Sequence, residues 1–480
     1  MCAVARDKHR AAATLLLAGC LGLTLAAPLS AQLSGQAAPE TPPLQLVVEQ
    51  ELVPADLLGG EGLGASSAVD GDVAVITAPG SDEVATNGGA AYVFRRGPGG
   101  WQFEIKLAPP DLLGTDAFGR SCSLDGDVLA IGAPQHAALG TKAGAVYVYR
   151  EIAGTWTFEQ KLFASTPIPF AEFGTDVAVS GDVVAVGMYR QSGGNLGRVF
   201  MFRHDTSSWV EEDIVSSADS VTNDLYAYSL DVDGDDMVIG AYQDDNVGSM
   251  YFHRWNGAEW AFLHKAFAPD AQTGDLFSKG LSMSDGVVIA GANREDSNGI
   301  DAGAAYVYRF NGAEWAHEQK LLASDGVSTD RFGTHVAVAG DMILVGARFD
   351  DHPGLTDAGS AYVFRRSGGS WVQKTKLIGS DTDPSDLLGH TVSTDGTTLL
   401  VNSQAHAHGA GSAAGGSYAF NFPLHDGPPL LLPMPSVMRF GPGSPPLLQL
   451  VAPGGGVPHH ARPKVSPARP RTASGTPPLR

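Results

Sequence analysis

The chain has 480 residues, of which 43% are hydrophobic and 17% charged, and it carries a formal net charge of −21. This hydrophobic content can bury a sizeable core, so the chain as a whole is not disordered. The acidic balance argues against nucleic-acid binding, which needs clustered Lys and Arg to neutralise phosphates, and it favours cationic ligands.

The N-terminus has the pattern of an export signal. Three basic residues precede an apolar run from 11 to 27, and small residues follow around Ala31, which predicts a secretory signal peptide over residues 1–31. An alternative is open, because Leu17-Ala18-Gly19-Cys20 resembles a lipobox in which Cys20 would carry a lipid anchor. Either processing route predicts a secreted or cell-surface protein, with residues 32–43 as a short linker.

Residues 44–422 repeat one unit. The copies open with Phe-Gly or a related pair and start about 51 to 56 residues apart, which indicates a repeat architecture. The starts are Leu63-Gly64, Phe118-Gly119, Phe173-Gly174, Tyr226-Ala227, Phe277-Ser278, Phe332-Gly333 and Leu388-Gly389. One tryptophan per unit keeps the same phase, and we expect each to pack against its own unit: Trp101, Trp156, Trp209, Trp260, Trp315 and Trp371.

The sequence of each unit predicts four antiparallel strands. In the unit from Phe332, FGTHVAVA and MILVGA flank a Gly340-Asp341 turn, and GSAYVF and WVQKTKL follow, with turns typical of hairpins. Several strands are apolar over consecutive residues, as strands covered on both faces are. Four-stranded sheets stacked radially form a propeller, whereas sandwiches need longer units. The prediction is therefore an all-β protein, a seven-bladed β-propeller of four-stranded antiparallel blades.

The ends of the array predict how the ring closes. The last unit ends at Phe422 after its third strand, and residues 44–56 align with the fourth strand of another unit at 315–325. In this alignment Glu49-Gln50 fall on Glu318-Gln319, and Leu46 takes the place of Trp315. We therefore expect the N-terminal strand to complete the last blade, which would remove two open sheet edges.

The Pro-rich residues 423–480 differ in composition from the repeats. Such sequence buries too little apolar surface to fold alone, so we expect a disordered tail.

The repeat resembles the FG-GAP family, whose best-known members are the β-propellers of integrin α subunits. The likeness is carried by the Phe-Gly starts and by Gly132-Ala133-Pro134, with variants at 77–79, 291–293 and 346–348. The resemblance implies an extracellular ligand-binding or adhesion module of the bacterial secreted type.

Calcium-binding members of that family carry loops of the form DxDxDG, because calcium takes six to eight oxygen ligands. In this chain only Asp231, Asp233 and Asp235 approach the pattern. They are candidate calcium ligands, and the alternative is a hairpin turn with extra solvating carboxylates.

Acidic loops are predicted to gather on one face. The loops between second and third strands share a face with the connections between blades, and their carboxylates outnumber the bases there, Lys142, Arg190, Arg294, Arg331 and Arg348. Such a face would focus negative potential on calcium or on a cationic surface. The candidate metal groups are Glu295, Asp296 and Asp301, and Asp350, Asp351 and Asp357; Asp82, Glu83, Asp244 and Asp245 complete the candidate binding face. The alternative is that these residues cap their own loops and keep the protein soluble.

No catalytic motif such as HExxH or GxSxG is present, so we expect no enzymatic activity. His406 and His408 look like a metal pair, yet no third ligand of suitable spacing accompanies them. The predicted function is a monomeric binding or adhesion module for an extracellular protein or glycan, with a membrane contact only through a lipidated Cys20. Two alternatives remain, a structural surface or matrix component without a specific ligand and a glycan-processing enzyme using loop carboxylates.

Overall fold

A computed structural model describes residues 46–190, 196–221, 223–407, 414–422 and 447–450. The predicted signal peptide, the linker over 32–43, the lipobox at Cys20 and His408 lie outside the described residues, so they stay predictions. No helix in the described part of the chain is long and apolar enough to span a membrane.

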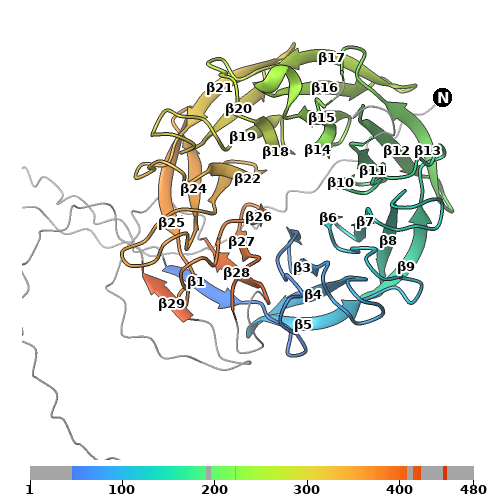
Figure 1. Cartoon of the computed structure of the whole chain (residues 1–480), viewed down its shortest axis with the longest axis horizontal. Helices are drawn as coiled ribbons and strands as arrows, with labels where there is room; N and C mark the ends of the chain where they lie inside the picture. Colours follow the sequence, from blue (N-terminus) through green and yellow to red (C-terminus); the bar gives the residue numbers. More distant parts are fainter. Residues whose placement is uncertain (1–45, 191–195, 222, 408–413, 423–446, 451–480) are drawn as a thin grey trace, which may run out of the picture. The chain divides into compact units, whose positions relative to one another are not determined.

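The unit Pro43–Arg480 contains seven antiparallel sheets set as blades around a centre (Figure 1). In blades 1 to 6 the strands neighbour one another in sequence order, and the first strand of each lies nearest the centre (Figure 1). The predicted all-β seven-bladed propeller is thereby confirmed.

Blades 1 to 3 consist of β2 (Ser67–Asp70), β3 (Val73–Ala78), β4 (Ala90–Gly97) and β5 (Gly100–Leu107); β6 (Ser121–Asp125), β7 (Val128–Ala133), β8 (Ala145–Ile152) and β9 (Thr155–Leu162); and β10 (Val177–Ser180), β11 (Val183–Met188), β12 (Arg198–His204) and β13 (Trp209–Val215). Blades 4 to 6 consist of β14 (Tyr226–Asp233), β15 (Asp236–Ala241), β16 (Ser249–Trp255) and β17 (Trp260–Ala266); β18 (Phe277–Ser284), β19 (Val287–Ala292), β20 (Ala304–Phe310) and β21 (Trp315–Leu321); and β22 (Phe332–Ala339), β23 (Met342–Ala347), β24 (Ser360–Ser367) and β25 (Ser370–Leu377). Blade 7 consists of β26 (Thr391–Thr394), β27 (Thr398–Ser403), β28 (Gly416–Asn421), β1 (Leu46–Glu51) and β29 (Leu447–Leu450). A short 3₁₀ turn, η1 (Asp244–Asn246), follows β15.

The core lies between blades. Every residue of β3, β7 and β23 is buried, because a neighbouring blade covers each side of the sheet. The apolar clusters accordingly combine side chains of two adjacent blades, as Leu129 and Tyr147 of blade 2 do with Val75 of blade 1. This explains why the strands read as continuous apolar runs.

The N-terminal strand completes the last blade. β1 pairs antiparallel with β28, from Val48 opposite Asn421 to Glu51 opposite Tyr418. On its other side β1 pairs with β29, a strand inside the segment expected to be a disordered tail. Residues 447–450 therefore form a strand within that segment, and the rest of 423–480 lies outside the described residues, so the disordered tail stays a prediction.

Gln50 and Glu51 lie opposite Ala419 and Tyr418 as Gln319 and Lys320 lie opposite Val307 and Tyr306, so this part of the predicted alignment is confirmed. Before Gln50 the pairing of β1 differs by one residue from the predicted alignment. In the other six blades the third and fourth strands shift register, as between Val363 and Phe364, whereas β1 runs beside β28 without a shift. Glu49 lies opposite Phe420 as Gln373 lies opposite Phe364. The equivalence of Leu46 and Trp315 is consequently wrong by one position, because a bulge is visible only once the partner strand is known.

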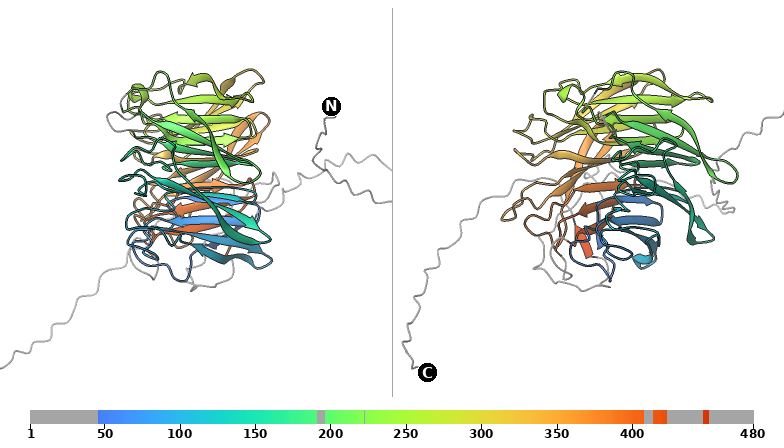
Figure 2. Two further views of the ribbon diagram at one scale, coloured as in Figure 1. Left: turned by 90° about the vertical axis from the view of Figure 1, so that its right-hand side faces the viewer. Right: turned by 45° about the vertical axis from the view of Figure 1, so that its right-hand side comes forward.

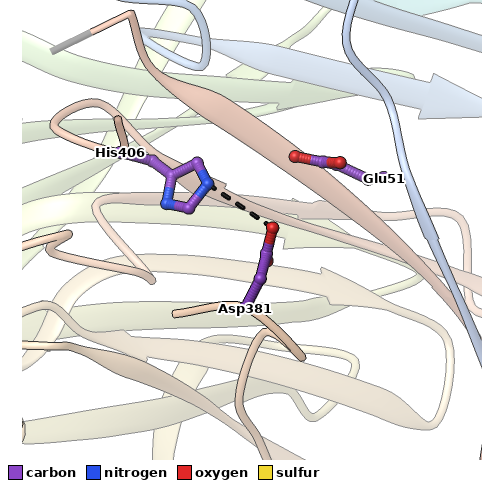
Figure 3. Close-up of side chains that lie close together, drawn as sticks. All are labelled: Glu51, Asp381 and His406. Carbon is purple, nitrogen blue, oxygen red and sulfur yellow. Dashed lines mark ion pairs between the residues drawn. The ribbon is translucent and has the colours of Figure 1, made fainter. Parts of the chain in front are cut away.

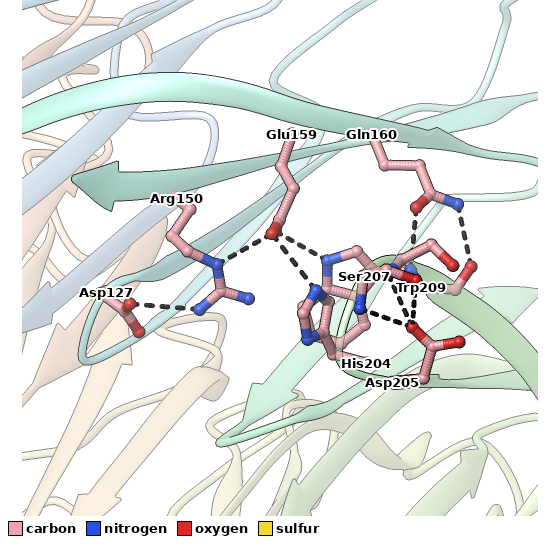
Figure 4. Close-up of polar contacts among 9 residues, drawn as sticks. Asp127, Arg150, Glu159, Gln160, His204, Asp205, Ser207 and Trp209 are labelled. Carbon is pink, nitrogen blue, oxygen red and sulfur yellow. Dashed lines mark hydrogen bonds and ion pairs between the residues drawn. The ribbon is translucent and has the colours of Figure 1, made fainter.

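The tryptophans pack on their own blades, as expected, and they also join neighbouring blades. Trp315 lies 5.5 Å from Phe310 of its own blade, measured between ring centres. Trp315 of blade 5 stacks on Phe252 of blade 4, with ring centres 5.0 Å apart and planes 9° apart. In blade 3 the Trp209 N–H donates to Gln160 Oε1 of blade 2 at 2.8 Å, and Gln160 Nε2 donates to the Trp209 carbonyl at 2.9 Å (Figure 4).

The same pair of hydrogen bonds between a glutamine side chain and a tryptophan backbone, which we call the amide clamp, recurs where the ring closes. Gln50 of β1 accepts the Trp101 N–H at 2.7 Å and donates to the Trp101 carbonyl at 2.5 Å. The N-terminal strand therefore binds blade 1 in the way that an internal fourth strand binds its neighbour.

Seen on edge, the strands cross the thickness of the ring, so that their connections lie on two faces (Figure 2). The loops after second strands meet the connections between blades on one of them, since the Thr115 N–H donates to the Thr86 carbonyl and the Gly80 N–H to the Glu61 carbonyl. We call this the loop face.

Candidate functional site

The candidate calcium loop in blade 4 lies between blades. The Asp231 carboxylate accepts the Met283 N–H of blade 5, and the Asp233 carboxylate accepts the Asp285 N–H, each at 2.7 Å, while Asp235 is exposed. Asp231 and Asp233 thus fix adjacent inner strands, a role that the periodic Asp-Gly turns did not reveal. Among the described residues these three do not meet as a group of metal ligands, and calcium binding by this loop stays a prediction.

The buried acids of the other candidate groups face lysines. Glu295 accepts Lys320 Nζ at 2.8 Å, Asp350 lies 2.6 Å from Lys376 Nζ, and Asp244 lies 2.5 Å from Lys265 Nζ. Glu83 likewise accepts Lys106 Nζ at 2.8 Å. These lysines belong to fourth strands, and their long side chains reach the loop face, which the loop-by-loop charge balance left out.

The exposed acids mostly cap their own loops. Asp296 accepts the Asp301 N–H and Asp351 accepts the Asp357 N–H, both at 2.8 Å, and Asp82 accepts the Asn87 N–H at 2.7 Å. Asp301 also lies 3.5 Å from Arg331, and Asp245 stays exposed with a φ of 51°. The rim of the loop face is therefore less negative than predicted, and calcium binding there stays a prediction.

Cations gather instead at the centre of the loop face. The inner strands surround a channel of about 660 Å³. At its loop-face end stand the residues that follow the repeat-opening pair, and one residue that follows a second strand. We call this group the channel mouth: Arg120, Tyr228, Lys279, His390 and Arg348.

The positive charges of the channel mouth repel one another. Burial lowers the pKa of Lys279 to about 8, and the positive charges of Arg348, Arg294 and Arg331 contribute. Burial is also the largest cause that lowers the pKa of His390 to about 3, and the positive charge of Arg348 is the next largest cause. Within the described residues, Arg348 Nε is buried without a hydrogen-bond partner. Clustered cations that depress one another's pKa values are stabilised by a bound anion.

Aromatic rings surround these cations. Tyr228 lies between Tyr189 and Tyr242, at ring-centre distances of 5.4 and 4.7 Å. Arg348 lies 4.7 Å from the centre of the Phe349 ring. Arg and Tyr are the side chains enriched at binding hot spots, where the rings also hold the cations by cation–π attraction.

A comparison with models of protein families identifies the same repeat that the sequence shows. The model of the FG-GAP repeat matches residues 47–94, 101–149, 156–202, 209–252, 260–308, 315–364 and 371–420. The chain belongs to the FG-GAP repeat family. Each matched FG-GAP repeat starts in the fourth strand of one blade and ends in the third strand of the next, which is why the first starts in β1 and the last ends in β28. The FG-GAP propeller fold supports a generic role as a protein-binding module.

A chain of the solved "Crystal Structure of Mitotic Checkpoint Complex" aligns with this chain at a TM-score of 0.46, with 12% identity over 83% of this chain and 99% of that chain. A search of curated proteins finds no match.

The cations of the channel mouth occupy two repeat positions at which the blades depart from one another and which sequence reasoning did not use. One is the residue after the Phe-Gly pair, which is Arg120, Lys279 or His390 in these blades. The other is the proline of Gly-Ala-Pro, whose place Arg348 takes. These departures were the available signal, because the ring brings the same repeat position of every blade to one channel.

A second cluster lies at the seam of the FG-GAP ring. Glu51, Asp381 and His406 come together there, from β1 and from two loops of blade 7 (Figure 3). Burial lowers the pKa of His406, but hydrogen bonds to Asp381 and Asp386 outweigh it and raise the value to about 10. His406 thus has partners that are distant in sequence, which spacing alone did not show.

Proposed function

We propose that the protein is a secreted or cell-surface FG-GAP binding module that holds an acidic segment of an extracellular partner protein at the channel mouth. The observation that supports this most is the group Lys279, Arg348 and His390, whose pKa values are all lowered and whose arginine Nε is buried without a partner in the described residues. Carboxylates of a partner would supply the missing negative charge.

The size and surroundings of the site suit an extended segment. A volume of about 660 Å³ falls within the range of roughly 300–1,000 Å³ typical of ligand pockets. Arg348 offers a planar fork that can bind a carboxylate through two parallel hydrogen bonds.

Isothermal titration calorimetry of the whole protein with a Glu-rich peptide, and with the same peptide carrying Gln for Glu, tests this site. We expect binding of the Glu peptide only, weakened at least about tenfold by Lys279→Gln or by Arg348→Gln, since each removes an ion pair worth roughly 1.5–3 kcal/mol. Lys374→Gln, on the outer strand β25, is the control and should bind as the unchanged protein does. Equal binding by all variants, or no binding at all, would reject the channel mouth.

We further propose that adhesion depends on calcium bound at the rim of the loop face. The basis is a set of exposed carboxylates there, those of Asp82, Glu83, Asp245, Asp296 and Asp351. Thermal melts in EDTA and in millimolar calcium test it, because a ligand of the folded state raises the midpoint by mass action. An unchanged midpoint would reject calcium binding at the rim. The proposal of peptide binding would then be tested by the calorimetric titration alone.

We propose binding in preference to catalysis or a purely structural role. Asp296 and Asp351, the carboxylates that a glycan-processing enzyme would use, each accept a hydrogen bond from their own loop. Incubation with glycans should therefore show no turnover, and turnover that Asp351→Asn abolishes would restore the enzyme alternative.

A further inference from the structure

Five blades place a lysine ammonium at one repeated position. In each, the lysine of the fourth strand lies opposite a tyrosine of the third, in the pairs Tyr92 and Lys106, Tyr147 and Lys161, Tyr251 and Lys265, Tyr306 and Lys320, and Tyr362 and Lys376. The ammonium contacts an aspartate of the loop that enters the blade, as Lys320 does with Asp270 at 2.6 Å. It also contacts a side chain of the loop after the second strand, as Lys320 does with Glu295.

Blade 7 lacks the lysine. The residue opposite Tyr418 is Glu51, while the aspartate of the entering loop is kept as Asp381, which accepts the Tyr418 hydroxyl at 2.7 Å. The third position holds His406. In blade 7 a carboxylate therefore replaces the ammonium that elsewhere joins the other two groups.

Blade 2 is the matched comparison, because it also has a histidine at the third position. There Lys161 Nζ lies 2.9 Å from His136 Nε2 and donates to Asp111. The two blades thus share an aspartate, a histidine and a tyrosine, and they differ in having Lys161 or Glu51 among them.

The three side chains of blade 7 offer their ligand atoms to one point (Figure 3). A carboxylate oxygen of Glu51, one of Asp381 and a ring nitrogen of His406 all lie within 4.8 Å of one another. Asp381 Oδ1 is held by Tyr418, while Oδ2 lies 3.7 Å from His406 Nε2. Ligand atoms around a tetrahedral zinc lie about 3.3 Å apart, so small side-chain rotations would complete the site.

Buried neighbours orient the histidine. His406 is 3% exposed, and its Nδ1 lies 2.7 Å from Oδ2 of Asp386, which is also buried. A carboxylate on the second ring nitrogen fixes the tautomer that presents Nε2, as it does in zinc sites. Asp381 and Glu51 are more exposed, which gives an ion a path from solvent.

A buried carboxylate oxygen beside this cluster adds a second, independent sign of a missing cation. Glu49 is 2% exposed, and its Oε2 has no hydrogen-bond partner among the described residues. The carboxylates of Glu51, Asp381 and Asp386 therefore lie around the imidazole of His406, at the position where five other blades supply a lysine.

We propose that Glu51, Asp381 and His406 bind a divalent transition-metal ion, best represented by Zn²⁺, in the place that a lysine ammonium takes in other blades. One imidazole nitrogen with carboxylate oxygens suits zinc, whereas calcium and magnesium prefer oxygen ligands alone. The ion would link the closing strand β1 to the loop of Asp381 and to the loop of His406, so it would stabilise the closed ring.

The test is zinc binding by the full chain after EDTA treatment, with stoichiometry from calorimetry and melting midpoints in parallel. Glu51→Lys restores the lysine of the other blades, and we expect it to bind one zinc ion fewer than the unchanged protein, as Asp381→Asn should. Zinc should raise the midpoint of the unchanged protein by several degrees and leave that of Glu51→Lys in place. His136→Gln and Asp111→Asn in blade 2 should keep the full zinc stoichiometry.

Equal zinc stoichiometry in the unchanged protein and in Glu51→Lys would overturn the proposal, since any bound zinc would then lie elsewhere on the chain. The melt of Glu51→Lys in EDTA shows that the variant is folded, so a loss of zinc in that variant cannot be attributed to unfolding.

Discussion

At the scale of single residues, Gly144 shows how the repeat fixes one blade to the next. The residue precedes β8 with a φ of +90°, and a Cβ placed on it would lie 2.0 Å from the Phe173 carbonyl oxygen of the neighbouring blade. Glycines with the same contact precede the third strand in other blades, at Gly89, Gly248, Gly303, Gly359 and Gly415. The Phe-Gly start of each repeat is therefore matched by a glycine of the preceding blade.

We expect Gly144→Ala to destabilise the fold far more than Gly154→Ala does. Both glycines have positive φ, but nothing lies within 4 Å of a Cβ at Gly154. The Gly154 substitution should cost about 1–2 kcal/mol of unfolding free energy from backbone strain alone. Gly144→Ala should cost about 1–3 kcal/mol more, because the neighbouring backbone must move. Chemical denaturation of the two variants measures the difference, and equal losses would contradict the contact.

Prediction from the sequence succeeded where a residue type recurs in phase, and it failed where residues differ between repeats. Asp330 recurs before the Phe-Gly pair and accepts the Val327 N–H at 2.7 Å, the structural role expected of a periodic residue. Lys279 and Arg348 break the pattern and meet only because the ring closes. One-dimensional charge balance assigned Arg348 to an acidic face, since it cannot place a residue at the centre or at the rim.

At the scale of elements, the fourth strand carries the contact between blades. Gln160 of β9 brackets the Trp209 backbone through two hydrogen bonds, and Glu159 accepts Trp209 Nε1 at 2.8 Å (Figure 4). The sequence predicts the strand and the phase of its tryptophan from periodicity. It does not predict the bulge or the side on which the tryptophan packs, because both depend on a partner strand.

Removing the clamp should weaken the contact without changing the fold. Gln160→Ala loses two hydrogen bonds at a half-buried seam, and at about 0.5–1.5 kcal/mol each the unfolding free energy should fall by roughly 1–3 kcal/mol. Gln102→Ala removes an exposed glutamine from the equivalent strand β5 and should change it by less than about 0.5 kcal/mol. Urea unfolding distinguishes them, and a Gln160 variant as stable as the Gln102 control would show that apolar packing alone holds the blades.

At the scale of the whole molecule, the ring is closed by a strand from the far end of the sequence. β1 supplies the fourth strand of blade 7, and Leu52 just beyond it is 1% exposed. Gln50 also ties this strand to blade 1. Closure therefore joins the first and last repeats through pairing, burial and a clamp, so unfolding of one blade is coupled to that of the others.

Deleting residues 44–52 should open the ring. The deletion leaves the edge of β28 without its partner and removes the buried Leu52, whose burial alone contributes about 1.5–3 kcal/mol. We expect a lower and broader calorimetric transition, with a calorimetric enthalpy larger than the van't Hoff enthalpy, because blades 7 and 1 would unfold apart from the rest. A variant that lacks only residues 32–43 keeps β1 and should melt like the unshortened chain. A sharp transition at the original temperature after deletion of 44–52 would mean that contacts among the remaining strands are enough to hold seven blades in a ring, and that the pairing of β1 contributes little to cooperativity.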